Sequence, residues 1–347
     1  MRGARLNLPI RLAALWLVGG CGSSHFVPPP PPTDVPMTVG LYDDSLRFVV
    51  SVQVGDAPPF DALLDTGSSG LRVLAASLPD SALTEILSTQ VAEVYGGSFE
   101  VVGRIALAPL TIGGLTTPQP IPIMHIDSVG CASADPKCNV AQELEEHFSG
   151  FAAILGVGMR NSKVAPVIGN PIAQLGGQPS FIVQAPPFPG GAGTLRISPA
   201  AAEVAPYTLF QLPNDQAELK LANGTPAWND LLLPTCLDDQ TSGAQYCAGA
   251  LFDTGTPEII VKLPSHSGDA TMVPAGDALT VGLGATATTP PQLSYDFTVS
   301  PMPQQGADLV YVESTTASEA LNMGNALYFA YDVYYDQVKG EVGFLAK

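Results

Sequence analysis

The chain contains two copies of one local pattern, an apolar strand that ends in Asp-Thr-Gly followed by a hydroxyl residue. The first copy is FDALLDTGSS, which carries Asp65, and the second is ALFDTGT, which carries Asp253 in the other half of the chain. A carboxylate at the end of a buried strand costs free energy unless hydrogen bonds satisfy it. One copy alone is typical of an ordinary turn in which the aspartate caps its own loop. Two copies predict a pair of acidic groups that act together.

Glycine and proline are frequent, with 35 Gly and 33 Pro among 347 residues, and only 13% of the residues are charged. This composition favours a fold that is mostly β and rich in turns. The length allows two lobes, each with a core. The formal net charge of −18 argues against a nucleic-acid partner, because phosphates require a basic surface.

The N-terminal residues have the pattern of an export signal. Arginines precede the short apolar run LAALWLVGG, which ends at Cys21. We interpret residues 1–20 as a signal peptide, because the run is too short to span a bilayer. The ending VGGC resembles a bacterial lipobox, in which the cysteine is lipidated after cleavage, so Cys21 is the expected anchor in the membrane. Ordinary secretion with an incidental Cys21 and an uncleaved anchor remain alternatives.

Residues 21–38 contain five consecutive prolines and predict an extended linker between the anchor and a globular part. The expected location is therefore the cell envelope, facing the periplasm or at the outer membrane or cell surface.

Four further cysteines form two close pairs in the sequence. In an exported protein they predict two local disulfides, Cys131–Cys138 and Cys236–Cys247. A zinc site is the alternative, but the spacings are not those of a zinc knuckle and the four histidines do not cluster with the cysteines. We expect no metal and no cofactor.

Several strands and one helix can be placed from local patterns. AEVYGGSFEVVGRIAL predicts a hairpin with Tyr95, Gly96 and Gly97 at its tip. NVAQELEEHF predicts a helix capped by Asn139. GFAAILGVGM predicts a buried strand that ends in glycines.

These segments together resemble the pepsin-like aspartic proteases over most of residues 40–347. VGDAPPFDALLDTGSSGL resembles the first active-site loop, VYGGSF the flap, and FAAILGVG the segment that backs the first loop. CAGALFDTGT resembles the second active-site loop, and MGNALYFAYDVYYDQVKGEVGF the C-terminal stretch. The resemblance implies a mostly β, bilobal fold with the active-site cleft between two lobes related by a pseudo-twofold axis. The expected lobes are residues 39–170 and 171–347.

The resemblance also implies roles for individual residues. Asp65 and Asp253 would share one proton, and the ionised member would activate a water molecule while the protonated member binds the scissile carbonyl. Tyr95, Gly96 and Gly97 would form the lid over the substrate. The supporting residues in the two loops would be Thr66, Gly67, Ser68, Thr254, Gly255 and Thr256.

Two residues depart from the pattern of the family. Arg72 stands where a tryptophan usually lies, which removes the expected hydrogen bond to the flap tyrosine and places a cation near the aspartates. We expect this cation to lower their pKa values. Glu258 adds a carboxylate close to the second loop.

The leading hypothesis is thus a monomeric aspartic endopeptidase that binds a polypeptide substrate in its cleft and is tethered to the membrane by an N-terminal lipid. The alternative is a catalytically silent relative that uses the cleft for binding or inhibition. A serine hydrolase is disfavoured, since TGSSG is not G-x-S-x-G.

Overall fold

The computed structural model describes residues 31–42, 45–96, 98–177, 179–188, 190–214, 224–300 and 309–347. The expected signal peptide at 1–20, the expected lipidation site Cys21 and the flap residue Gly97 lie outside these ranges. The first strand begins at Thr33, so the end of the segment expected to be linker belongs to the folded sheet.

The fold is mostly β and consists of two curled sheets. The larger sheet contains β1 (Thr33–Tyr42), β2 (Ser45–Val54), β3 (Phe60–Asp65), β4 (Ser69–Leu74), β5 (Glu85–Ile86), β6 (Val91–Tyr95), β7 (Phe99–Ala108), β8 (Leu110–Ile112), β9 (Leu115–Thr116), β10 (Ile121–Cys131), β11 (Ala153–Val157), β12 (Ser180–Gln184), β13 (Gly191–Ile197), β14 (Thr208–Gln211), β23 (Tyr331–Asp336) and β24 (Glu341–Ala346). The smaller sheet contains β15 (Leu233–Asp239), β16 (Gln245–Leu251), β17 (Ile259–Leu263), β18 (Thr271–Met272), β19 (Ala278–Leu283), β20 (Leu293–Thr298), β21 (Val310–Ser314) and β22 (Ala320–Asn322). Helices in the described residues are short: α1 (Val140–Phe148), α2 (Ala201–Val204) and α3 (Leu327–Ala330).

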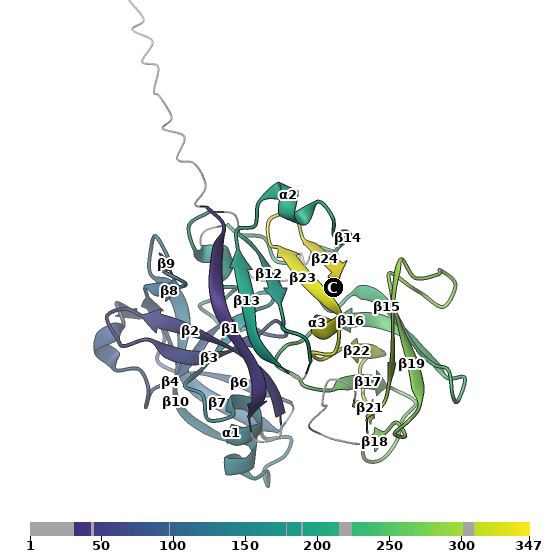
Figure 1. Ribbon diagram of the computed structural model, residues 1–347. Coiled ribbons are helices and arrows are strands. Elements are labelled where there is room, and N and C mark those ends of the chain that lie inside the picture. Colours follow the sequence, from purple (N-terminus) through teal and green to yellow (C-terminus); the bar gives the residue numbers. More distant parts are fainter. Residues whose placement is uncertain are drawn as a thin grey trace, which may run out of the picture.

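The larger sheet passes from one lobe into the other. Its strands run in the order β14-β24-β23-β12-β13-β1-β2-β3-β11-β4-β10-β7-β5. Strand β1 pairs with β2 on one side and with β13 on the other, so the two halves of the chain share one sheet. Figure 1 shows the smaller sheet on one side of the molecule, β2 to β10 on the other, and β1, β12, β13, β23 and β24 between them.

Each Asp-Thr-Gly loop is built in the same way. In the first lobe β11 lies between β3 and β4, parallel to β3 and antiparallel to β4. In the second lobe β22 lies between β16 and β17 with the same directions. The loop between the outer strands carries Asp65 in one lobe and Asp253 in the other. The structure therefore has the bilobal, pseudo-twofold architecture that the sequence predicts.

Buried apolar side chains form a continuous core that includes residues of both sheets, from Val35 near the start to Phe344 near the end. A second cluster packs beneath the β6–β7 hairpin and includes Phe99, Phe148 and Ile154. This second cluster joins the hairpin to α1 and to β11. The hairpin and the first Asp-Thr-Gly loop are thus supported by the same packed residues.

Both predicted disulfides are present. Cys131–Cys138 joins the end of β10 to the segment that precedes α1, and Cys236–Cys247 links β15 to β16, upstream of the second loop. Asn139 caps α1, as predicted, because its side chain accepts a hydrogen bond from the Gln142 N–H. In the part of the chain that the structure describes, no helix has the length and apolarity needed to span a membrane.

Candidate active site

Asp65 and Asp253 are each held by their own loop. The Asp65 carboxylate accepts hydrogen bonds from the Gly67 N–H at 2.7 Å, the Ser68 N–H at 3.1 Å and the Ser68 hydroxyl. The Asp253 carboxylate accepts from the Gly255 N–H and from the Thr256 hydroxyl, both at 2.8 Å. Strands β3 and β16 end at these loops, so the sequence pattern of apolar strand and Asp-Thr-Gly becomes two matching turns.

Two threonines lock the loops together. The Thr66 N–H donates to the Thr254 Oγ1 at 3.1 Å, and the Thr254 N–H donates to the Thr66 Oγ1 at 3.0 Å, across 188 positions of the chain. Each hydroxyl also donates across the axis, Thr66 to the Phe252 carbonyl and Thr254 to the Leu64 carbonyl. Both threonines are 1% exposed. Buried hydrogen bonds with both partners satisfied hold a geometry rigidly.

The two carboxyl groups approach each other closely. A Cβ atom added to Gly67 would lie 2.2 Å from the Asp253 Cγ, and one added to Gly255 would lie 2.7 Å from the Asp65 Oδ1. Only glycine leaves room for such an approach. Both aspartates line a cavity of about 420 Å³ that the β6–β7 hairpin and α1 also border.

Burial and the neighbouring Asp253 charge raise the pKa of Asp65 to about 7, against the opposing hydrogen bonds from Ser68 and Gly67. Asp65 is therefore protonated at acidic pH and ionises only near neutrality. The expected lowering of the pKa values of the aspartates by Arg72 stays a prediction.

Arg72 does not act as a free cation, because Glu93 neutralises it. The Arg72 Nε and Nη2 donate to the two Glu93 carboxylate oxygens at 2.5 and 3.0 Å, and the Nη1 donates to the carbonyls of Ser69 and Gly70. The guanidinium is 5.6 Å from the centre of the Tyr95 ring. Arg72 thus joins the first loop to the strand β6 of the flap.

The hairpin that the sequence predicts is present and borders the cavity. Strand β6 pairs with β7 from Val91 to Tyr95, and Tyr95 and Gly96 border the cavity with both aspartates. The Tyr95 hydroxyl is buried and has no hydrogen-bond partner among the described residues. Burial raises the pKa of Tyr95.

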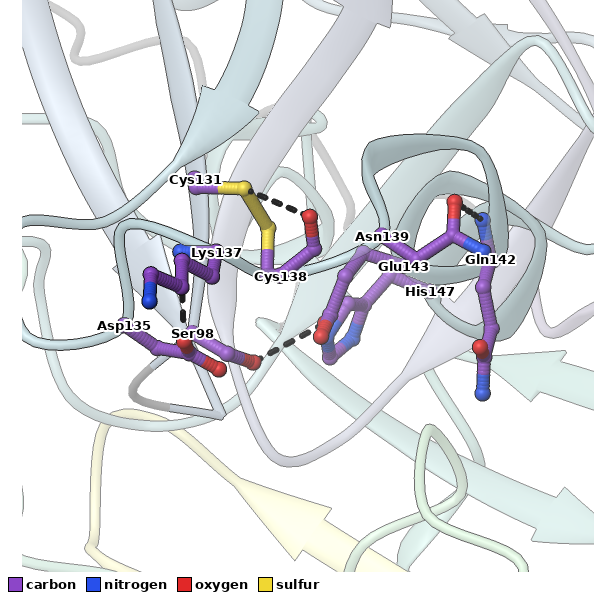
Figure 2. Close-up of a disulfide and its surroundings, with 9 residues drawn as sticks. All are labelled: Ser98, Cys131, Asp135, Lys137, Cys138, Asn139, Gln142, Glu143 and His147. Atoms are coloured by element: carbon purple, nitrogen blue, oxygen red, sulfur yellow. Dashed lines mark hydrogen bonds and ion pairs between the residues drawn. A yellow bond between two sulfur atoms is a disulfide. The ribbon is translucent and has the colours of Figure 1, made fainter.

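Helix α1 contacts the tip of the flap. Figure 2 shows the Ser98 hydroxyl donating to the Glu143 Oε2, at 2.9 Å, beside the Cys131–Cys138 disulfide. His147 stacks on Phe99 with ring centres 5.2 Å apart, and burial lowers the pKa of His147. The disulfide and the helix cap hold α1 at this end of the cavity.

Sequence reasoning missed one polar contact of the carboxyl pair. The Asn322 Nδ2 donates to the Asp253 Oδ2 at 2.8 Å, from the end of β22. A polar residue inside the apolar-apolar-Gly pattern of LNMG was the available signal. Glu258, which the sequence singled out, lies in the cavity wall, and burial raises its pKa. In the described part of the chain, no three acidic, cysteine or histidine side chains gather as metal ligands.

Comparisons with known proteins support the fold. The crystal structure of aspartic proteinase from Irpex lacteus superposes with a TM-score of 0.59 at 16% sequence identity, covering 91% of this chain and 97% of the proteinase. The sequence profile of a family described as "Protein of unknown function (DUF3443)" matches residues 60–170, which contain the first Asp-Thr-Gly loop and the flap. No curated protein sequence matches the chain.

Proposed function

We propose that the protein is an aspartic endopeptidase that hydrolyses peptide bonds of a polypeptide held in the cavity between the lobes. The observation that carries this proposal is the carboxyl pair Asp65–Asp253, which is locked by the Thr66–Thr254 hydrogen bonds beneath a hairpin that closes the cavity. If the two loops were only structural turns, Gly67 and Gly255 would not need to leave room for the carboxyl group of the opposite lobe.

The chemistry follows from the shared proton. The ionised carboxylate, which we assign to Asp253, takes a proton from a water molecule between the two groups, and the water oxygen bonds to the scissile carbonyl carbon. The protonated Asp65 donates a hydrogen bond to the carbonyl oxygen and stabilises the negative charge that develops there. The proton taken by Asp253 then passes to the leaving nitrogen as the C–N bond breaks. These steps involve no covalent intermediate with the protein.

The proposal includes a location. The sequence pattern before Thr33 predicts export and a lipid anchor at Cys21, so the protease would act as a monomer tethered to the cell envelope. Metabolic labelling with a palmitate analogue tests the anchor. Labelling that a Cys21→Ser change abolishes would support it, and equal labelling of both proteins would refute it.

Activity is tested with the purified mature chain and an unfolded protein substrate from about pH 3 to about pH 7. We expect cleavage that a statine-type transition-state analogue blocks, and no cleavage by Asp65→Asn or Asp253→Asn, with circular dichroism unchanged. Turnover that survives either change would refute the mechanism. No cleavage by the unmodified chain would instead favour a silent protein that uses the cavity for binding.

A further inference from the structure

The environment of Asp253 differs from that of Asp65 at one place. Asn322 lies at the end of β22, and its Nδ2 donates to the Asp253 Oδ2 at 2.8 Å and to the Thr256 Oγ1 at 3.3 Å. The Asn322 Oδ1 accepts from the Gly324 N–H at 3.0 Å. Because a backbone N–H can only donate, this bond fixes the amide oxygen on the side of Gly324 and leaves the NH₂ group facing the carboxylate.

The matching position in the first lobe holds no hydrogen-bond donor. Strand register places Ile154 opposite Leu63, two residues before Asp65. The same register places Asn322 opposite Leu251, two residues before Asp253. Ile154 and Asn322 are therefore counterparts across the pseudo-twofold axis, and an isoleucine side chain offers nothing to a carboxylate.

The Oδ2 atoms of Asp65 and Asp253 consequently have different hydrogen-bond partners. The Asp65 Oδ2 contacts the Ser68 hydroxyl, which can either donate or accept and so tolerates a protonated carboxyl group. The Asp253 Oδ2 contacts a hydroxyl and also an NH₂ group that can only donate. A donor of this kind favours the ionised form of the group it contacts.

We propose that Asn322 is a positioning residue that places the negative charge of the pair on Asp253 and the proton on Asp65, which makes Asp253 the general base. This inference rests on the proposed function for its meaning in catalysis. Its physical content, the distribution of charge within the pair, is measurable whether or not the protein cleaves peptides.

Other charged and titratable groups also face the pair. Arg47 on β2 attracts Asp253 more than Asp65 and so acts in the same direction as Asn322, while Glu258 and Glu146 offset its charge. The buried hydroxyls of Tyr328 on α3 and Tyr335 on β23 lie beneath the pair and stay neutral, because burial raises the pKa of each. The Arg72 charge near Asp65 is matched by Glu93.

Two substitutions separate a charge effect from a structural one. Asn322→Leu removes the donor and imitates the apolar side chain of Ile154. Asn322→Ala removes the whole amide and adds neither a large apolar group nor a charge. Asn229 provides the matched control, because its Oδ1 also accepts a hydrogen bond from the N–H two residues on, that of Leu231, at 3.2 Å. This bond does not involve the carboxyl pair.

In the pH profile of kcat/KM, the acid limb reports formation of the ionised base. We expect Asn322→Leu and Asn322→Ala to move this limb upward by about one pH unit, so that kcat/KM falls about tenfold below the limb and much less near neutrality. Asn229→Ala should leave the limb in place. A loss by the same factor at every pH would mean that Asn322 has only a structural role, and would overturn the inference.

A second measurement does not depend on turnover. In an Asp65→Asn background Asp253 is the remaining carboxyl group of the pair, and ¹³C NMR of its carboxyl carbon follows its titration. Adding Asn322→Leu, or Asn322→Ala should the leucine variant not fold, should raise the midpoint by about one pH unit. An unmoved midpoint would refute the role of Asn322 even in an active protease. A moved midpoint in a chain that does not cleave would refute only the proposed function.

Discussion

The pair of Arg72 and Glu93 gives the flap an anchor whose strength can be measured. Glu93→Gln keeps the size of the side chain and removes its charge. The Arg72 side chain is 5% exposed and the Glu93 side chain 15%, so water cannot replace the lost partner. Removing one partner of a buried ion pair costs about 3–5 kcal/mol. Arg72 keeps its bonds to the carbonyls of Ser69 and Gly70, so we expect the lower value, about 3 kcal/mol.

This energy should appear as easier opening of the hairpin. Glu93 lies on β6, which pairs with β7 and with no other described strand, so the loss falls mainly on this hairpin. A change of about 3 kcal/mol corresponds to an increase of about 100-fold in the equilibrium constant for opening. Amide hydrogen exchange read by mass spectrometry should therefore accelerate in peptides that cover residues 91–96 and 98–103. Arg72→Lys should act in the same direction, because an ammonium group cannot bond two oxygens in a fork.

The same sheet offers a matched control. Arg104 on β7 also binds a carboxylate with two donors, the Nε and Nη2 to Asp127 at 3.0 and 2.9 Å, but this pair is exposed. Asp127→Asn should change stability by less than about 1 kcal/mol and leave flap exchange unaltered. Equal exchange in Glu93→Gln and in the unmodified chain would show that the ion pair does not hold the flap.

Three further substitutions test the carboxyl pair and its support. Asp65 has a pKa of about 7 in the folded chain and an unperturbed value of 3.8, so the unfolded chain ionises first and the free energy of unfolding falls as the pH rises from about 4 to about 7. In urea unfolding, Asp65→Asn should abolish this decrease, which amounts to about 4 kcal/mol. The same dependence on pH in both proteins would contradict the raised pKa of Asp65. Thr254→Val removes buried hydrogen bonds to Thr66 and Leu64 and should lower the free energy of unfolding by about 2–4 kcal/mol, whereas a change below about 0.5 kcal/mol would argue against the lock. Gly67→Ala places a Cβ against the Asp253 carboxyl and should reduce kcat by at least about 100-fold in a chain that still folds, so wild-type turnover would show that the approach is not tight.

The features that could be predicted from the sequence are those that depend on a few neighbouring residues. The two loops follow from an apolar strand and Asp-Thr-Gly, the flap from Tyr-Gly-Gly between two alternating strands, and α1 from its Asn139 cap. The disulfides follow from short spacings between cysteines. None of these features depends on contacts between residues that are far apart in the sequence.

The features that sequence reasoning missed depend on register between distant strands. Glu93 meets Arg72 although β6 and β4 are not neighbours in the sheet, so no pairing pattern links them. Asn322 reaches Asp253 only because β22 inserts between β16 and β17. The partner of Arg72 was missed for the same reason, so the sequence analysis considered this cation without the neutralising charge of Glu93.

The sheet shared by the two lobes also imposes an order on folding. Thr33 in β1 pairs with Ile197, and Ser180 in β12 pairs with Asp336 near the end of the chain. Contacts between residues so distant in the sequence form late and slowly. During synthesis, the N-terminal half of the chain therefore lacks the strands that complete the shared sheet. The loop of Asp65 also lacks its partner, the loop of Asp253, until the C-terminal half has been made. The proposed protease activity would therefore arise only after the C-terminal half of the chain has been made, because Asp253 and the strands that support it belong to that half.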